Sequence, residues 1–435
     1  MNKNNRFAIQ PIVLGGLLCM PWSANLLAAN SPLNDVMKAQ ESQTTKAIDT
    51  SSQKWANWIL SQVQALPSLK ASHMGTLVAN EERSAMQQPL YNPELNLSYT
   101  EKDEEEYGVG VSQTIDWYNK GSARSSLGQV NYELADLDRQ LDTESKLAEA
   151  LYAYIDYATE KQLLVVAKQQ EQLLEQLSAD LKVREELGDV GNLDAELAYL
   201  SFSQNLQQIS LREIRFRKAL AGLEETLDTQ KVPFRPKSSV WKNDLQKLDL
   251  TPYLKQVINQ GLKTQKVQKQ LEQSQALSKI AKLERKSNPN LGFGLGRDGS
   301  ENTVSLEFSI PLNVRNNFSA EYRAALKKVS QSELEMLEEK RVLEKQIRLS
   351  FDNYQELSKR VLKWENITTK RVKGSKKILS KLWQSGDMTT SDYLFSLQQR
   401  TDSLIATIEL NTEMQKAWID WLVLTSQVES WLKHL

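Results

Sequence analysis

The fold is decided by residues 92–124, NPELNLSYTEKDEEEYGVGVSQTIDWYNKGSAR, and by their partial repetition later in the chain. Asn92-Pro93-Glu94-Leu95 recurs as Asn288-Pro289-Asn290-Leu291, and each copy opens a stretch of alternating apolar and polar residues. The end of the first stretch, VSQTI at 111–115, is echoed by FSIPL at 308–312. Such alternation is typical of strands with one wet and one apolar face. Each copy therefore predicts one strand hairpin.

A long stretch without proline follows each predicted strand hairpin, at residues 121–185 and 319–383. Apolar residues recur there every three or four positions, which is the spacing of coiled-coil seams. At 1.5 Å per residue an unbroken helix of this length would reach ~100 Å. The predicted seam residues are Leu134, Leu137, Leu141, Leu147, Leu151, Tyr154, Ala158, Leu173, Leu177 and Leu181, then Leu334, Leu337, Ile347, Phe351, Tyr354, Leu357 and Val361.

Both helical stretches break at a glycine motif, Leu187-Gly188-Asp189-Val190 in the first copy and Ser385-Gly386-Asp387-Met388 in the second. The pattern then resumes over 193–227 and 389–432, so each copy predicts a long antiparallel helical hairpin. Strand start, strand end and glycine turn recur in one order at offsets of 196, 197 and 198 residues. Three landmarks at nearly one spacing indicate a two-fold internal repeat.

The repeat sets the expected domain organisation. The first repeat covers residues 30–227, with a strand pair at 93–117 and a helical hairpin at 121–227. Residues 228–252 contain three prolines and link the copies. The second repeat covers residues 253–435, with a strand pair at 289–312 and a helical hairpin at 319–432.

The first 29 residues have the order of a secretory signal peptide, with Lys3 and Arg6, an apolar run over 7–20 and small residues up to Ala29. The run is shorter than the roughly 20 residues of a membrane-spanning helix. Cleavage would remove the single cysteine, Cys19, and two of the 54 basic residues, leaving 52 against 55 acidic ones. The mature chain would then have no thiol for a disulfide or metal site. Its near-neutral charge argues against a nucleic-acid partner.

The sequence contains no catalytic constellation. The two histidines, His73 and His434, are too far apart in sequence for a local metal-ligand pair. We find no Walker-type loop and no nucleophile motif, and the glycines of residues 292–296 have the period of a strand rather than of a phosphate loop. The sequence therefore predicts no enzyme, no cofactor and no metal site.

The predicted strands are too few to close a barrel alone. No apolar run after residue 29 is long enough for a transmembrane helix, so strands would have to hold this protein in a membrane. Two hairpins give four strands, whereas bacterial single-chain barrels begin at about eight. Several copies would therefore share one barrel, and the charged helices would project from it because charge opposes burial in lipid. The fold class is mainly α with a small β part.

The duplicated order of helix, Asn-Pro-led strand pair and helical hairpin with a glycine tip resembles the TolC-like outer membrane efflux proteins over essentially the whole mature chain. Residues 92–124 are particularly similar to the branch that serves cobalt-zinc-cadmium resistance. The resemblance implies an outer-membrane homotrimer with a twelve-stranded β-barrel in lipid and a periplasmic α-barrel. It also implies docking to a periplasmic adaptor and an inner-membrane pump of the resistance-nodulation-division type. The implied function is an efflux exit duct, with heavy-metal cations as cargo and with drugs or secreted peptides as open alternatives.

The resemblance also implies functional residues. Asp392 matches an aspartate that narrows the pore entrance, and threefold symmetry would make it an acidic ring that favours cations. Asp194 matches an aspartate that latches the closed tips, and Trp383, at a facing position, could donate its indole N–H. Both aspartates could instead be helix N-caps, and both tip glycines simple turns. The implied adaptor-docking residues are Leu187, Gly188, Asp189, Val190, Ser385, Gly386, Asp387 and Met388.

Two other classes stay open at this point. A periplasmic adaptor would carry one helical hairpin between two halves of a β-rich domain, whereas this sequence predicts two helical hairpins and few strands. A secreted coiled-coil scaffold or chaperone without a pore remains if the strand pairs are soluble. Partition of the mature protein with the outer membrane discriminates between duct and scaffold.

Overall fold

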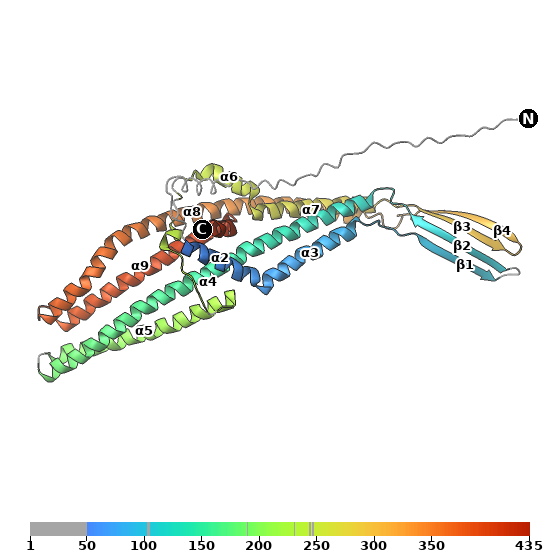
Figure 1. Cartoon of the computed structure of the whole chain (residues 1–435). Coiled ribbons are helices and arrows are strands. Elements are labelled where there is room, and N and C mark those ends of the chain that lie inside the picture. Colours follow the sequence, from blue (N-terminus) through green and yellow to red (C-terminus); the bar gives the residue numbers. More distant parts are fainter. Residues whose placement is uncertain (1–49, 102–104, 189, 230, 243–244, 246–247) are drawn as a thin grey trace, which may run out of the picture. The chain divides into compact units, whose positions relative to one another are not determined.

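The computed structural model describes residues 50–101, 105–188, 190–229, 231–242, 245 and 248–435. The predicted signal peptide and Asp189 lie outside the described residues. From residue 50 onward the chain belongs to one compact unit. Its four-stranded sheet lies where α4 begins, and the turns of the helical hairpins lie where α4 and α8 end (Figure 1).

Two very long helices organise the unit, as predicted. They are α4 (Lys120–Glu186), with 67 residues, and α8 (Ser319–Gln384), with 66. Each returns through a shorter partner, α5 (Asn192–Leu227) and α9 (Thr390–Leu424). None of the described helices is both long and apolar enough to cross a membrane. The remaining elements are α2 (Thr50–Ala65), α3 (Pro67–Gln87), a 3-10 turn η1 (Ser238–Trp241), α6 (Leu250–Gln260), α7 (Leu262–Glu284) and α10 (Val428–Lys433).

The helix ends follow from local chemistry. Gly188 and Gly386 have φ of +76° and +81°, a left-handed conformation that costs glycine little and ends both long helices. At the start of α4, the Asp116 carboxylate accepts hydrogen bonds from the backbone N–H groups of Lys120 at 2.9 Å and Gly121 at 2.8 Å. The final helix is shorter than the predicted range to 432, because the chain leaves α9 through Ser426 at φ +54° before α10 begins.

The two strand hairpins join into one antiparallel sheet in the order β1-β2-β3-β4. The strands are β1 (Glu94–Glu101), β2 (Glu105–Thr114), β3 (Asn290–Asp298) and β4 (Glu301–Ser309). The sequence predicted each hairpin, and the structure adds the pairing of β2 with β3, in which Val109 lies opposite Leu295. β1 and β4 are the edge strands.

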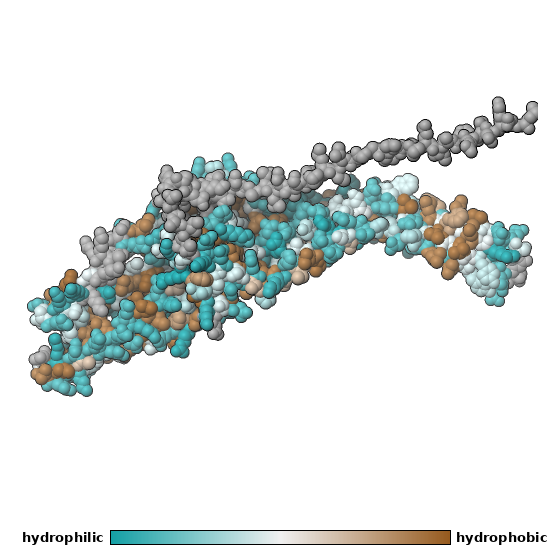
Figure 2. All heavy atoms as spheres, viewed as in Figure 1, coloured by the Kyte–Doolittle hydropathy of each residue, from teal (hydrophilic) through white to brown (hydrophobic). Residues whose placement is uncertain are grey.

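The two faces of the sheet differ completely in character. One face carries twelve large apolar side chains that are exposed to solvent, up to 83% for Leu306, and it has polar residues such as Arg297 and Asn302 near the hairpin turn. The opposite face carries five glycines on the two central strands, and the residues opposite them on β4 are polar, namely Thr303, Ser305 and Glu307. The apolar face consists of Leu95, Leu97, Tyr99, Tyr107, Val109, Val111, Leu291, Phe293, Leu295, Val304, Leu306 and Phe308. The glycine face is centred on Gly108, Gly110, Gly292, Gly294 and Gly296. Figure 2 shows hydrophobic residues gathered over the strands near the helices.

Most predicted seam residues are buried between helices, including Leu147, Leu151 and Leu181 in α4 and Ile347 in α8. Leu334 and Leu337, two of the predicted seam residues, are 68% and 60% exposed in the single chain. The buried side of α8 is the side of Ile347 and its neighbours, and the described elements of the chain leave these two leucines largely exposed.

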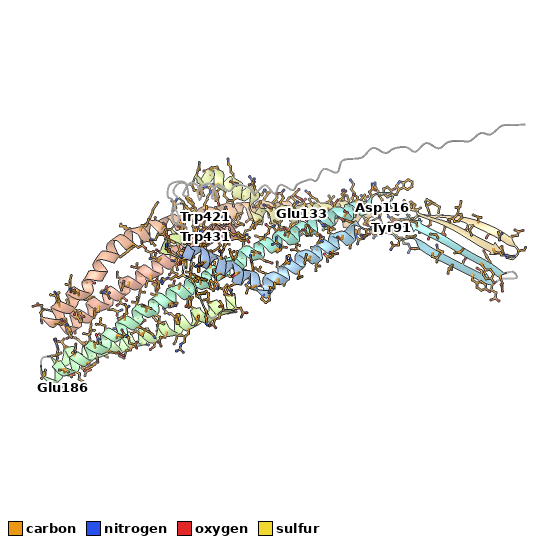
Figure 3. All side chains as sticks on the ribbon, viewed as in Figure 1. Tyr91, Asp116, Glu133, Glu186, Trp421 and Trp431 are labelled. Carbon is orange, nitrogen blue, oxygen red and sulfur yellow. The ribbon has the colours of Figure 1, made fainter. Side chains whose placement is uncertain are left out.

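An aromatic cluster joins segments that are distant in sequence. Trp55 lies 5.6 Å from Trp241, and Trp418 lies 6.2 Å from Trp431, between ring centroids. These four side chains and Trp421 are each at most 3% exposed, and Figure 3 labels Trp421 and Trp431. The cluster therefore ties α2, η1, α9 and α10 together.

The buried carboxylate of Glu144 holds the last helix in place. Glu144 is 8% exposed and accepts hydrogen bonds from the backbone N–H groups of Val428 at 2.7 Å and Glu429 at 3.1 Å. Burial, opposed by these two bonds, raises the pKa of Glu144 to about 7.

Candidate functional site at the hairpin tips

The two helical hairpins pack together near their turns. A tip cluster of buried apolar residues draws on all four helices, and it consists of Leu174, Leu177, Leu181, Ala198, Phe202, Trp383, Tyr393, Leu394 and Leu397. The first five come from α4 and α5 and the last four from α8 and α9. The tips of one chain are therefore held at one level by a shared core.

Trp383 is the central side chain of this tip cluster and is 5% exposed. Its ring stacks on Tyr393 with 5.2 Å between centroids and 9° between planes. The guanidinium carbon of Arg184, in the other hairpin, lies 4.6 Å from the Trp383 ring centroid, which is a cation–π contact. The indole Nε1–H donates to Thr390 Oγ1 at 3.3 Å. In this structure the indole thus bonds to its own hairpin and not to Asp194.

The two predicted aspartates lie in equivalent places, in the first turns of α5 and α9, and both are exposed. Thr389 Oγ1 accepts from the Asp392 backbone N–H at 3.1 Å and donates to the Asp392 carboxylate at 2.8 Å. Asp392 is therefore part of a reciprocal helix cap whose N-cap residue is Thr389. Asp194 and Asp392 do not meet each other within the chain's tip cluster.

The predicted docking residues divide into an exposed rim and an anchored pair. Leu187 is 70% exposed, and Gly188 and residues 385–387 are exposed as well. Val190 and Met388 instead pack against the tip cluster. Ser385 Oγ donates to Asp387 Oδ2 at 2.7 Å, which braces the second turn.

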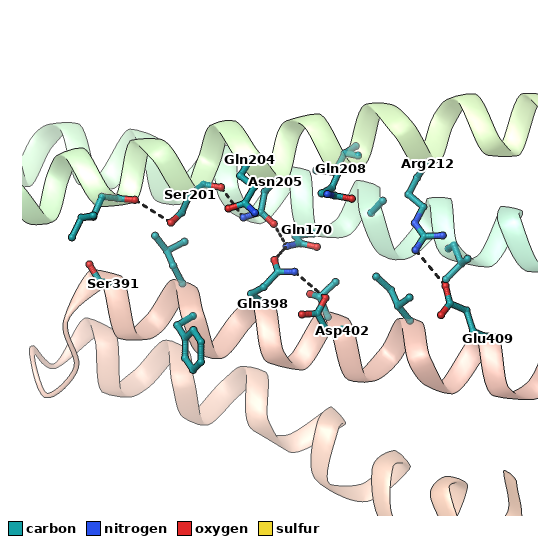
Figure 4. Close-up of a pocket in the computed structure, with 18 residues that line it drawn as sticks. Gln170, Ser201, Gln204, Asn205, Gln208, Arg212, Ser391, Gln398, Asp402 and Glu409 are labelled. Atoms are coloured by element: carbon teal, nitrogen blue, oxygen red, sulfur yellow. Dashed lines mark hydrogen bonds and ion pairs between the residues drawn. The ribbon is translucent and has the colours of Figure 1, made fainter. Parts of the chain in front are cut away.

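A polar groove of about 770 Å³ runs between α5 and α9, with α4 as its floor (Figure 4). Gln170 Nε2 donates to Asn205 Oδ1 at 2.7 Å and to Gln398 Oε1 at 3.2 Å, so amides from three helices meet in the groove. Arg212 and Glu409 approach to 3.5 Å further along. The sequence predictions missed this groove, although the glutamines at 204, 207 and 208 were a visible signal of a wet helix face.

Away from the tips, the contact between α4 and α9 is polar. Asp156 pairs with Lys416 at 2.7 Å, and the hydroxyls of Thr159 and Thr412 lie 2.7 Å apart. The Tyr152 hydroxyl donates to Asp420, and burial together with this carboxylate raises the pKa of Tyr152. The hairpins therefore meet through apolar side chains at the tip cluster, and through these polar pairs further from the tips.

Among the residues that the structure describes, no three His, Cys, Asp or Glu side chains gather as a metal site.

Two helical hairpins attached to one four-stranded antiparallel sheet define a known class of architecture, the fold of outer-membrane channel proteins. The chain superimposes on CusC with a TM-score of 0.70 at 14% identity, over 86% of this chain and 92% of that chain. For the CmeC outer membrane channel of Campylobacter jejuni the TM-score is 0.71 at 11% identity, over 88% of this chain and 90% of that chain. For the open state of the MtrE outer membrane channel of Neisseria gonorrhoeae the TM-score is 0.67 at 13% identity, over 86% of this chain and 89% of that chain. No protein-family model and no curated protein sequence matches the chain.

Proposed function

We propose that this protein is the outer-membrane exit duct of a tripartite efflux system and performs no chemical reaction of its own. The observation that carries the proposal is the sheet, which exposes twelve large apolar residues on one face and has five glycines at the centre of the opposite face. The shared fold with solved outer-membrane channels supports the same function.

The apolar face is unfavourable in water. Twelve large exposed apolar residues on one sheet form a patch of the kind that marks a membrane or protein contact. The edge strands β1 and β4 each have backbone N–H and C=O groups without a strand partner, and lipid offers these groups no hydrogen bonds. Three copies would contribute twelve strands to one closed barrel, with the apolar face toward lipid and the glycine face toward the lumen. A homotrimer is therefore part of the proposal.

The helices would form the periplasmic part of the duct, and their tips its entrance. The exposed rim at Leu187, Gly188 and residues 385–387, with Val190 and Met388 behind it, would dock a periplasmic adaptor that connects to a resistance-nodulation-division pump. Asp392, repeated by threefold symmetry, would form the narrowest acidic ring. Trp383 would act as the tip latch with Arg184 as its partner within the chain, and the exposed Asp194 would act between copies.

Metal cations are the proposed cargo. This assignment rests on the similarity of residues 92–124 to the cobalt-zinc-cadmium branch and on the acidic ring that three Asp392 carboxylates would make. Export by cleavage near Ala29 is part of the same proposal, and N-terminal sequencing of the mature protein tests it.

The test is fractionation of an epitope-tagged chain, followed by mass measurement of the detergent-extracted species and conductance in planar bilayers. We expect a trimer in the outer-membrane fraction that forms discrete channels. A soluble periplasmic monomer without conductance would overturn the duct and leave the coiled-coil scaffold.

A further inference from the structure

Two consecutive basic residues lie at the end of the sheet from which the helices extend. Arg285 directly follows α7, and Lys286 precedes the Asn288-Pro289 motif that leads into β3. Both side chains are exposed. We call these two residues the boundary cations, because they lie where the sheet of the proposed function leaves the lipid.

Aromatic rings from two other segments hold the boundary cations. The guanidinium carbon of Arg285 lies 5.6 Å from the ring centroid of Tyr322, which is near the start of α8. Lys286 Nζ lies 4.7 Å from the ring centroid of Tyr118, which is between β2 and α4. A cation–π contact orients a cation without neutralising its charge. Both positive charges are therefore positioned and still available to an anion.

The acidic side chains near the boundary cations in the sequence are bound to other groups. Glu284 pairs with Lys120 at 3.3 Å, and Glu321 accepts a hydrogen bond from Asn316 at 3.2 Å. The Asp116 carboxylate accepts from the first backbone N–H groups of α4. Within the described part of the chain, no carboxylate forms an ion pair with either boundary cation. Their place at the carboxyl end of α7 is favourable for the helix dipole, but that role leaves their charge open to a further partner.

Exposed apolar side chains flank the boundary cations. Trp117, in the loop after β2, is 68% exposed, and Leu312 and Val314, after β4, are 76% and 85% exposed. Asn313 Nδ2 donates to the backbone carbonyl of Arg285 at 3.2 Å, so the segment after β4 lies against the boundary cations. Aromatic and basic side chains beside apolar surface are typical of the level of lipid headgroups.

We propose that the boundary cations bind the phosphate group of an anionic phospholipid in the leaflet that faces the helices. The inference rests on the proposed function, because it requires the sheet to lie in a membrane. Phosphate oxygens can accept from the guanidinium and the ammonium group together, while the acyl chains lie along the exposed apolar residues. Two adjacent positive charges favour a lipid with net negative charge over a zwitterionic one, whose ammonium group they repel.

Native mass spectrometry of the full chain, extracted in detergent as the intact assembly, tests this lipid site. The assembly is titrated with phosphatidylglycerol and, separately, with zwitterionic phosphatidylethanolamine, and the bound lipids are counted. The test variant carries Arg285→Gln and Lys286→Gln. The matched control carries Lys327→Gln and Lys328→Gln, an exposed consecutive pair that lies eight residues, roughly 12 Å, beyond the start of α8.

We expect the wild-type trimer to retain phosphatidylglycerol in preference to phosphatidylethanolamine. The test variant should bind phosphatidylglycerol on the order of 5- to 25-fold more weakly, since each basic residue near an anionic lipid surface contributes about fivefold in affinity. The control variant should match the wild type. If the test variant does not assemble, Lys286→Gln alone replaces it, with an expected loss of about fivefold.

A trimer that loses no more affinity for phosphatidylglycerol in the test variant, or in Lys286→Gln, than in the control would overturn the lipid site and leave the duct standing. Equal retention of both lipids by the wild type would overturn it as well. A chain that stays soluble and monomeric would overturn the proposed function and the lipid site with it.

Discussion

The guanidinium carbon of Arg184 lies 4.6 Å from the centroid of the Trp383 ring, so a residue of the first hairpin is bound to a residue of the second within one turn of both tip glycines. Trp383 is in turn stacked on Tyr393 and hydrogen-bonded to Thr390. The second hairpin thus presents a fixed aromatic surface, and Arg184 is the group that must leave when the tips separate.

Arg184→Gln should favour separation of the tips. Loss of a cation–π contact of about 0.5–2 kcal/mol would raise the ratio of open to closed entrances by roughly 2- to 30-fold. Planar-bilayer recordings of the open fraction measure the effect. Arg83→Gln is the matched control, because Arg83 lies 4.6 Å over the Tyr132 ring far from the tips. Equal open fractions in the two variants would show that Arg184 does not latch the entrance.

A charge on the apolar face should block membrane assembly. Leu306→Arg places a guanidinium on the proposed lipid side at a cost of about 2–4 kcal/mol per chain near the bilayer midplane. Ser305→Arg, at the adjacent residue on the glycine face, is the control. We expect the outer-membrane yield of the Leu306 variant to fall several-fold below that of the Ser305 variant. The opposite ranking would mean that the faces have been assigned the wrong way round.

Glu144 should make stability depend on pH. Its pKa is raised from 4.5 to about 7 in the folded state, so the folded protein binds this proton more tightly than the unfolded chain does. Its contribution to stability is therefore fully present below about pH 4.5 and is lost as pH rises toward 7, a change on the order of 3 kcal/mol at most.

Glu144→Gln removes the titrating carboxyl group. The unfolding midpoint of this variant, measured by thermal or urea denaturation, should therefore change less between pH 4.5 and 7.5 than that of the wild type. Glu149→Gln, at an exposed position on the same helix, should leave the slope unchanged. A Glu144→Gln slope identical to that of the wild type would assign the pH dependence to other groups.

Asp392→Asn should weaken cation selectivity. The change removes three negative charges from the proposed ring but leaves an oxygen that can accept from Thr389, so the cap is largely kept. Reversal potentials in a salt gradient measure selectivity, and we expect a shift toward zero. Asp402→Asn, in the polar groove, is the control. A loss of selectivity in the Asp402 variant alone would assign the acidic constriction to the groove and not to Asp392.

Local patterns predicted the elements well because each one is specified by its own stretch of chain. Period-two alternation located all four strands, and apolar spacing located α4 and α8 to within a residue or two. Gly188 and Gly386 ended these helices because their positive φ is a local property.

Contacts between distant segments could not be read in the same way. Leu334 and Leu337 have core spacing yet are exposed, since spacing identifies an apolar side but not its neighbour. Trp55, Trp241 and Trp431 come together from three separate segments with no shared motif. Arg184 was unremarked in the sequence because its role comes from Trp383, 199 residues later.

The unbroken course of α4 has a mechanical consequence. Its 67 residues would span ~100 Å as a single rod. Its first turn is fixed by the Asp116 carboxylate, which also accepts from Asn288 Nδ2 at 3.3 Å, while the Ile115 N–H bonds to the Pro289 carbonyl at 2.8 Å. Hydrogen bonds at the start of α4 thus connect this helix to both strand hairpins. One continuous helix therefore connects the Gly188 turn to the place where the two strand hairpins join.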